Sequence, residues 1–197
     1  MIDTQDIGRV TRCSTLGFVG AVRLPEPDVP AFGTFCLAEA QQGQSQVIGL
    51  IYDLSIEDDE FARQIAATDD VPQEIIADGR AHRQVPVEFS ALAVGYHNEI
   101  GYFQSLPPQP PLTLAPIRRM APEDLRAFSQ RLDFLPLVLA ASQVPSETLL
   151  VAALQTMAHS HPESERRGFL VAAGRACARL MHHDLARLED LLKGLNR

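Results

Sequence analysis

The sequence contains no tryptophan, a single lysine (Lys193) and three cysteines among its 197 residues. The cysteines Cys13, Cys36 and Cys177 lie far apart, are odd in number and form no Cys-x-x-Cys motif. This usage excludes a disulfide framework. We therefore interpret all three as small buried apolar residues and expect a reducing, cytoplasmic location.

Long hydrophobic runs are also missing. No segment approaches the roughly 18 uninterrupted apolar residues that a membrane-spanning helix requires. The first residues, Met1–Asp6, carry acids where a signal peptide would have a basic and then an apolar segment. We therefore expect no membrane association. The apolar share of 46 % is ordinary for a globular protein that buries a core.

Positive charge is scarce in the first half of the chain. Residues 1–115 contain 6 Lys or Arg and 16 Asp or Glu, whereas residues 116–197 contain 11 and 9. The two halves therefore carry net charges of −10 and +2. Because nucleic-acid affinity depends largely on cations that displace counterions, direct nucleic-acid binding by the first half is disfavoured.

What the first half does contain is a series of short runs separated by turn signals, and the first of them, Ile7–Cys13, alternates apolar and polar residues as half-buried strands do. The sequence predicts strands at Ile7–Cys13, Phe18–Leu24, Phe32–Leu37, Val47–Tyr52 and Val85–Tyr96. Such short strands with regular turn signals favour a barrel or a sandwich. The proline-rich segment Leu106–Leu114 is expected to be extended.

A helical excursion is predicted between residues 55 and 84. Ser55 followed by Asp58 is typical of a helix start, and the acidic run Glu57–Glu60 suits the positive end of a helix dipole. We prefer this interpretation to a divalent-cation site, because the run lacks the alternating spacing and the turn glycine of a calcium loop. A thin apolar face would come from Phe61, Ile65, Ile75 and Ile76.

The second half is predicted to be helical, with Pro122 in a first helical turn. Helices are expected at Ser146–His159 and Glu163–Lys193. One stripe of the longer helix predicts packing onto the barrel or onto another helix. It consists of Leu170, Ala173, Cys177, Leu180, Asp184, Leu188, Leu191 and Leu195. The predicted fold is α+β: a small closed antiparallel β-barrel over residues 1–115, followed by an α-helical domain over residues 116–197.

The strand series resembles a known family. Ile7-Gly-Arg-Val, Ser14-Thr15, Phe18 and the strand that ends at Pro25 resemble the opening of the HerA/ATP-synthase (HAS) barrel. Further similar segments are Phe32-Gly-Thr-Phe, the glycine-containing strand Val47–Tyr52, the closing strand Val87–Tyr96 and the proline-rich exit at Leu106. The resemblance covers residues 7 to about 115. It implies a barrel that helps ring subunits assemble or docks a nuclease partner, next to a motor domain.

The motor itself is missing from this sequence. No G-x-x-x-x-G-K-[ST] motif occurs, so no loop of backbone amides and lysine is available to hold a triphosphate. No G-x-S-x-G nucleophile elbow occurs either. We expect no catalytic residue, no cofactor and no metal site.

Two pairs of histidines are candidate metal ligands. His182 and His183 would point about 100° apart on a helix, and His159 and His161 fall at an expected helix–helix turn. We interpret all four as solvated surface residues.

Arginines supply the remaining candidate site. Arg166, Arg167, Arg175, Arg179 and Arg187 could form a docking surface for an acidic partner, possibly the acidic barrel of a second copy. The alternative is a solvated or salt-bridged helix face.

Three functions remain open on this sequence. The first is a non-catalytic, homo-oligomeric assembly or adaptor module for a separately encoded HerA-like ATPase or nuclease. The second is an enzyme whose site lies between the barrel and the helices, with His97, Tyr96 or Glu99 as contributors. The third, a single-strand nucleic-acid-binding barrel, is disfavoured by the acidic first half.

Overall fold

The computed structural model describes residues 6–23, 30–56, 63–64, 67–68, 71–74 and 86–196. Within these ranges the strands are β1 (Asp6–Ser14), β2 (Gly17–Arg23), β3 (Phe35–Ala40), β4 (Ser45–Ile56), β5 (Pro86–Asn98), β6 (Gly101–Phe103) and β7 (Pro116–Arg119). A short 3-10 turn, η1 (Gln41–Gly43), joins β3 to β4. The helices are α3 (Pro122–Phe128), α4 (Leu135–Ala140), α5 (Ser146–Ser160), α6 (Glu163–Leu180) and α7 (Leu185–Leu195).

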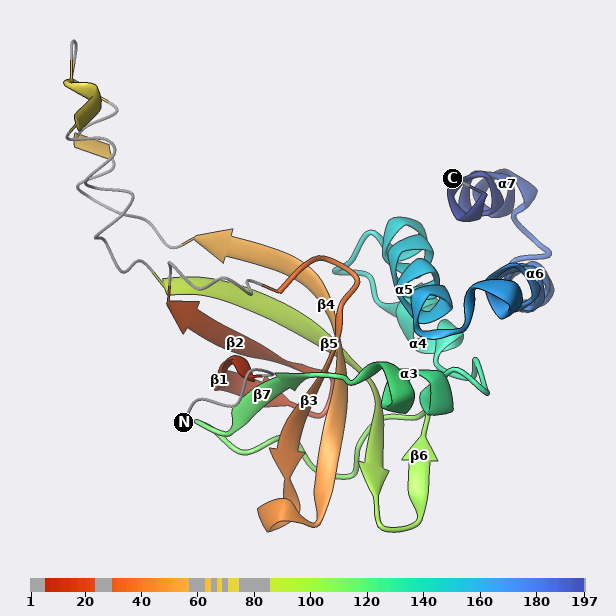
Figure 1. The fold of residues 1–197 in the computed structure, drawn as a ribbon, viewed down its shortest axis with the longest axis horizontal. Helices are drawn as coiled ribbons and strands as arrows, with labels where there is room; N and C mark the ends of the chain where they lie inside the picture. The colour runs from red at the N-terminus through yellow and green to blue at the C-terminus, as the bar shows by residue number, and fades with distance from the viewer. Residues whose placement is uncertain are drawn as a thin grey trace.

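Six of these strands form a closed antiparallel barrel. Around the ring the order is β1, β2, β5, β4, β3 and β7, and β7 pairs with β1 again. The ring closes because β2 pairs with β5 along its length, from Gly17 opposite Leu92 to Val22 opposite Val87. β6 extends β5 as a hairpin outside the ring. The predicted α+β class, a barrel followed by helices, is confirmed (Figure 1).

Two hydrophobic clusters hold the structure together. The first fills the barrel interior with side chains from alternate positions of the strands, among them Val10, Phe18, Ile51, Phe89 and Ile117. Each of these side chains is at most 3 % exposed. Alternation places their neighbours on the outer surface of the barrel, where a second cluster forms.

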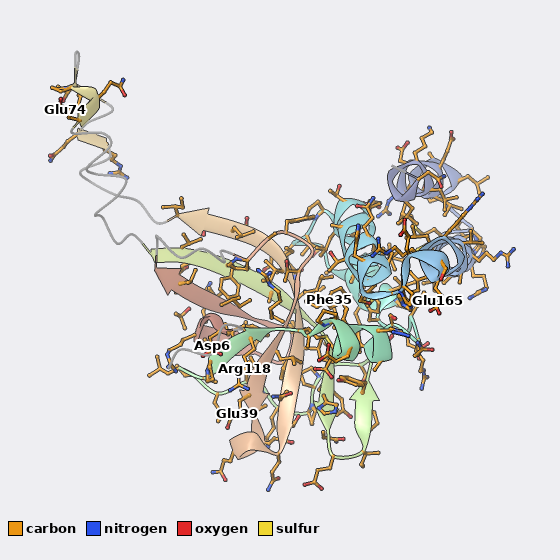
Figure 2. All side chains as sticks on the ribbon, viewed as in Figure 1. Asp6, Phe35, Glu39, Glu74, Arg118 and Glu165 are labelled. Carbon is orange, nitrogen blue, oxygen red and sulfur yellow. The ribbon has the colours of Figure 1, made fainter. Side chains whose placement is uncertain are left out.

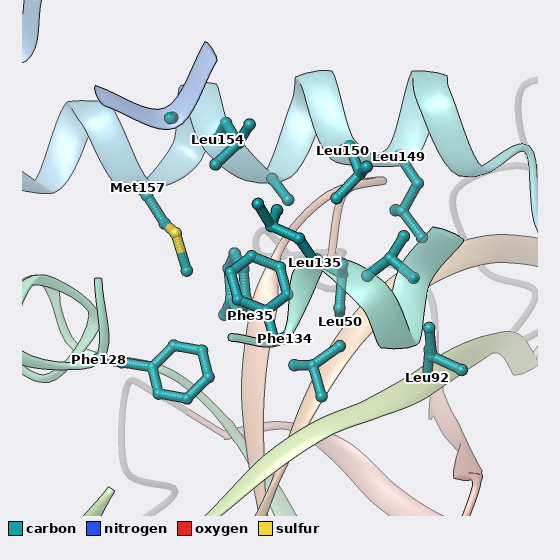
Figure 3. Packing of buried hydrophobic residues seen from close by; sticks show 14 of the residues in the cluster. Phe35, Leu50, Leu92, Phe128, Phe134, Leu135, Leu149, Leu150, Leu154 and Met157 are labelled. Carbon is teal, nitrogen blue, oxygen red and sulfur yellow. The ribbon is translucent and has the colours of Figure 1, made fainter. Parts of the chain in front are cut away.

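The second cluster lies between the outer surface of the barrel and the helices. Phe35, Leu50 and Leu92 project from β3, β4 and β5 toward α4 and α5 (Figure 3). The ring of Phe35 meets the ring of Phe134 edge-on, at 6.0 Å between centroids. Helices α6 and α7 pack on α5 in turn. The helical part of the chain therefore shares one continuous core with the barrel.

Most predicted strands correspond to observed ones, but one begins later than predicted. The prediction Phe32–Leu37 is wrong at its start, because Phe32 and Gly33 form a turn and β3 begins at Phe35. Gly33 has a φ of +81° and leaves no room for a β-carbon, which would lie 2.5 Å from Cβ of Ala152 on α5. Strand β7 was not anticipated. It begins directly after the predicted boundary at residue 115.

The helix predicted over Glu163–Lys193 is wrong, since the structure contains two helices there. α6 ends at Leu180, and α7 begins at Leu185 with Asp184 as its N-cap, whose carboxylate accepts the backbone N–H of Arg187. A residue that caps a new helix cannot continue the previous one. Leu180, in the middle of the predicted apolar stripe, is 43 % exposed. The stripe is therefore not buried as one continuous face. The helix predicted at Ser146–His159 is confirmed as α5.

The helix start predicted at Ser55 is wrong, because Ser55 lies in β4 opposite Glu88 and the strand continues to Ile56. The rest of the predicted excursion, up to residue 84, falls mostly outside the described residues. This applies to Asp58, to the acidic run Glu57–Glu60 and to the apolar residues Phe61, Ile65, Ile75 and Ile76. These interpretations stay predictions. Among the helices that the structure does describe, none combines the length and apolar character needed to cross a membrane.

Candidate functional site

Helix α6 carries three of the five arginines singled out in the sequence on one exposed face. Arg167, Arg175 and Arg179, together with Val171 between them, follow one another at steps of four residues and are all exposed. Four-residue steps keep side chains on the same side of a helix. We call these four residues the arginine face. The opposite side of α6 buries Ala173, Gly174 and Cys177.

Charge on the arginine face is unbalanced. Within the described residues, none of its three guanidinium groups has a hydrogen bond or an ion pair. No Asp or Glu occurs between residues 166 and 183, and the nearest acid of α6, Glu165, lies in the first turn (Figure 2). Val171 is 48 % exposed in the middle of these cations. Within the described residues the face is therefore not salt-bridged, and a docking surface and a solvated helix face both remain as interpretations.

The other two arginines of the predicted set lie elsewhere. Arg166 is half-buried, and its Nε donates to the carbonyl oxygen of His161 at 3.2 Å. Arg187, on α7, forms an ion pair with Glu147 at the start of α5, and its Nε lies 3.9 Å from Asp184. Partial burial of Glu147 acts to raise its pKa, but its backbone hydrogen bond and the Arg187 guanidinium lower it below the usual range. Arg166 and Arg187 therefore hold helices in place.

His161 is not a solvated residue, so that interpretation is wrong for this histidine. It is 9 % exposed, its Nε2 lies 2.8 Å from Oγ of the buried Ser129, and its ring stacks on Phe169. Its Nδ1 lies 3.8 Å from a carboxylate oxygen of Glu165. The sequence carried no signal for this arrangement, because Ser129 and His161 are 32 residues apart and meet only through the packing of α3 against α5.

A serine, a histidine and a carboxylate in this order resemble the parts of a hydrolytic triad, but the hydrogen bonds argue for a structural role. Oγ of Ser129 donates its only proton to the carbonyl oxygen of Arg126, at 2.8 Å. Because the hydroxyl has no second proton to give, we assign the contact with His161 as a donation from Nε2–H to Oγ. A general base would need a free lone pair on that nitrogen. The pair instead joins the end of α3 to the end of α5.

The remaining histidines give no metal site in the described part of the chain. His159 is exposed and its Nδ1 lies 2.7 Å from the carbonyl oxygen of Gln155. His182 and His183 lie in the turn between α6 and α7 and not within a helix. The prediction that their side chains point about 100° apart is therefore wrong, and their ring centroids are 3.6 Å apart. No group of three or more His, Cys, Asp or Glu side chains is placed to bind a metal among the described residues.

The residues proposed for an enzyme at the barrel–helix junction pack within a hairpin instead. Tyr96 stacks on Phe103 at 4.8 Å between ring centroids, and His97 lies against Tyr102 at 4.4 Å, both across β5 and β6. Glu99 is exposed in the turn between these strands. The hydroxyl of Tyr102 donates to Asp124 at 2.7 Å and so attaches the hairpin to α3.

A cavity does exist at the junction, with other residues around it. It has a volume of about 290 Å³ and lies between β3, β7, α3 and α5. Its lining consists of Ala31, Thr34, Phe35, Arg119, Met120, Pro122, Leu125, Thr156, His159 and Ser160. Of these residues the sequence singled out only His159, and as a possible metal ligand, because the cavity is formed only by the docking of the helices on the barrel.

Comparisons with protein-family models and with curated proteins found no match for this chain.

Proposed function

We propose that this protein is a non-catalytic assembly or adaptor module that docks an acidic surface of a protein partner through the arginine face of α6. The observation that carries the proposal is the arrangement, around an exposed valine, of three guanidinium groups that have no partner among the described residues. Arginine is enriched and lysine depleted at protein interfaces. A chain with one lysine and 16 arginines has the composition for such a surface.

The chemistry of the face also favours a protein over a nucleic acid as partner. Three arginines along one helix can each bind a carboxylate through two parallel hydrogen bonds, which gives geometric specificity as well as charge attraction. Val171 adds an apolar contact at the centre, where interfaces lose their water. The net charge of −8 would meanwhile oppose approach to a phosphate backbone.

The kind of partner is proposed from the resemblance. Residues 7 to about 115 resemble the HAS barrel, which in its family accompanies a motor domain and helps rings assemble or docks a nuclease. A closed barrel by itself does not identify this family. We propose that the partner is a separately encoded DNA-processing translocase or nuclease, and that the module itself is homo-oligomeric.

Affinity purification of the tagged protein from its native cells, followed by mass spectrometry, tests this proposal. The double variant Arg175→Glu/Arg179→Glu reverses charge on the arginine face, and Arg12→Glu/Arg126→Glu makes the same change at exposed positions outside it. We expect a motor ATPase or a nuclease to co-purify with the wild type and with the second variant, but not with the first. Equal recovery with both variants, or recovery of no partner, would contradict the proposal.

A further inference from the structure

The junction cavity combines an apolar floor with an exposed rim. Phe35, Met120 and Leu125 form the floor, and each is at most 5 % exposed. These residues come from β3, from the chain directly after β7, and from α3, so the floor is part of the core shared by barrel and helices. The volume of about 290 Å³ lies at the lower end of the range for small-molecule sites, about 300–1,000 Å³.

Two polar groups at this cavity have no partner among the residues that the structure describes. Arg119 is exposed, and neither its guanidinium group nor the hydroxyl of the half-buried Thr34 has a partner within the part of the chain that the structure describes. Both belong to the barrel side of the cavity. Together they supply a cation with several N–H donors and one hydroxyl donor beside apolar surface.

The polar groups on the helix side are already engaged. The hydroxyl of Thr156 donates to the carbonyl oxygen of Ala152 at 2.9 Å, and that of Ser160 donates to Met157 at 2.6 Å. The Nδ1 of His159 contacts the carbonyl oxygen of Gln155. Since Nδ1 is the donor in that contact, Nε2 of the neutral His159 ring is an acceptor. The side-chain donors available to a ligand therefore lie on the barrel side of the cavity, while its floor offers no hydrogen bond.

We infer that the junction cavity binds a small carboxylate with a short apolar body. The carboxylate would accept hydrogen bonds from Arg119 and Thr34, and the apolar body would lie on Phe35, Met120 and Leu125. A planar guanidinium group pairs well with a carboxylate through two parallel hydrogen bonds. A phosphate fits less well, since a single cation beside an apolar floor would leave most of its charge unmatched. This site goes beyond the proposed docking function and does not depend on it.

Titration of the ¹⁵N-labelled full chain with hexanoate, followed by amide chemical shifts, tests the inference. We expect saturable shifts at Phe35, Met120, Leu125 and Thr156. Arg119→Gln should weaken binding about tenfold, the change expected for one charge-assisted hydrogen bond. Thr34→Val, which keeps the shape of the side chain, should weaken it less. Arg126→Gln removes an exposed arginine outside the cavity and should leave the affinity unchanged.

Two further ligands test whether the charge is needed and whether the site is for a small molecule or for a protein segment. Hexan-1-ol has the same apolar body without the charge and should bind more weakly than hexanoate. The blocked dipeptide N-acetyl-Leu-Glu-amide presents a carboxylate as a protein side chain would, and it should also bind more weakly. Tighter binding of the dipeptide would overturn the assignment to a small molecule in favour of a protein segment. Hexanoate binding that is absent, or unchanged in Arg119→Gln, would overturn the site.

Discussion

At Gly49 in β4, a β-carbon would lie 2.6 Å from the ring of Phe18 and 3.0 Å from Cβ of Ala91 in the barrel interior. Glycine at this position lets the Phe18 ring occupy the space where a side chain would stand. We expect Gly49→Ala to destabilise the fold by about 1–3 kcal/mol, the usual effect of overpacking a filled core. Urea denaturation followed by circular dichroism measures this change.

Gly168→Ala provides the matched control for that substitution. Gly168 lies in α6 with nothing within 4 Å of the added β-carbon, and alanine is the better helix former. This variant should therefore be more stable than the wild type by about 0.5–1 kcal/mol. A Gly49→Ala variant as stable as the wild type would contradict the assigned packing of Phe18 against Gly49.

Ser129 offers a second test at the scale of a single residue, because its structural and catalytic interpretations predict different results. Ser129→Ala leaves Nε2 of the buried His161 without its partner, and the carbonyl oxygen of Arg126 keeps only the longer contact from Gln130, at 3.3 Å. We expect a loss of about 1–3 kcal/mol in the free energy of unfolding. Ser164→Ala, at an exposed position of α6, should change it by less than about 0.5 kcal/mol.

Phenylmethanesulfonyl fluoride, which labels activated serines, separates the two interpretations directly. The structural interpretation predicts no adduct on Ser129 in the folded protein, because His161 donates to this hydroxyl and cannot accept its proton. An adduct at Ser129, located by peptide mass spectrometry, would show that the serine is activated after all.

At the scale of elements, the ion pair between Glu147 and Arg187 fastens α7 to the start of α5. The folded protein lowers the pKa of Glu147, so this contact stabilises the fold near neutral pH and is lost as the pH falls through and below 4.5, the ordinary value for the group. Both side chains are partly solvated, which limits the contribution to about 0.5–1 kcal/mol.

We therefore expect Glu147→Gln to lower stability at about pH 7 and to differ little from the wild type at about pH 3.5. Urea midpoints at the two pH values measure this difference. Glu163→Gln, in the first turn of α6 and without an ion pair in the described residues, is the control and should not reproduce it. A Glu147→Gln effect of the same size at both pH values would mean that the carboxylate charge is not responsible.

The elements also show how far the sequence could predict this structure. Strand β1 was predictable from its alternation, and β2, β4 and β5 were predictable as apolar runs bounded by turn signals. β7 has four residues between a proline-rich segment and Pro122, too few for a period to be visible, and its place in the ring depends on partners far away in sequence. The break at Asp184 was missed because the apolar spacing continues across it, although aspartate is a preferred N-cap.

The candidate sites also differ in how far the sequence could predict them. Arg167, Arg175 and Arg179 could be placed on one face from their spacing alone, since a single helix carries them. Arg119 and Thr34 come from separate strand ends and meet at a cavity only after the helices pack. The pairing of Ser129 with His161 likewise depends on two helices. Sites within one element could be read from periodicity, whereas sites between elements could not.

At the scale of the whole molecule, the barrel and the helices are joined by a common core. Phe35, Ile48, Leu50, Leu92 and Val94 are barrel residues, at most 5 % exposed, that belong to the cluster beneath the helices. Uncovering one such side chain costs about 1.5–3 kcal/mol. Uncovering all of them approaches the whole stability of a typical domain, about 5–15 kcal/mol. The closed ring of backbone hydrogen bonds would then have to offset this loss alone.

We therefore expect a chain shortened to residues 1–120 not to fold cooperatively, although it contains every strand of the barrel. The full chain should unfold in a single thermal transition, whereas the shortened one should bind a hydrophobic dye and show no transition. A soluble, shortened chain with a sharp thermal transition would instead make the barrel an independent domain. If the shortened chain does not fold, the helices and the barrel form one rigid unit. A partner that docks on the arginine face of α6 is then also held in a fixed position relative to the barrel.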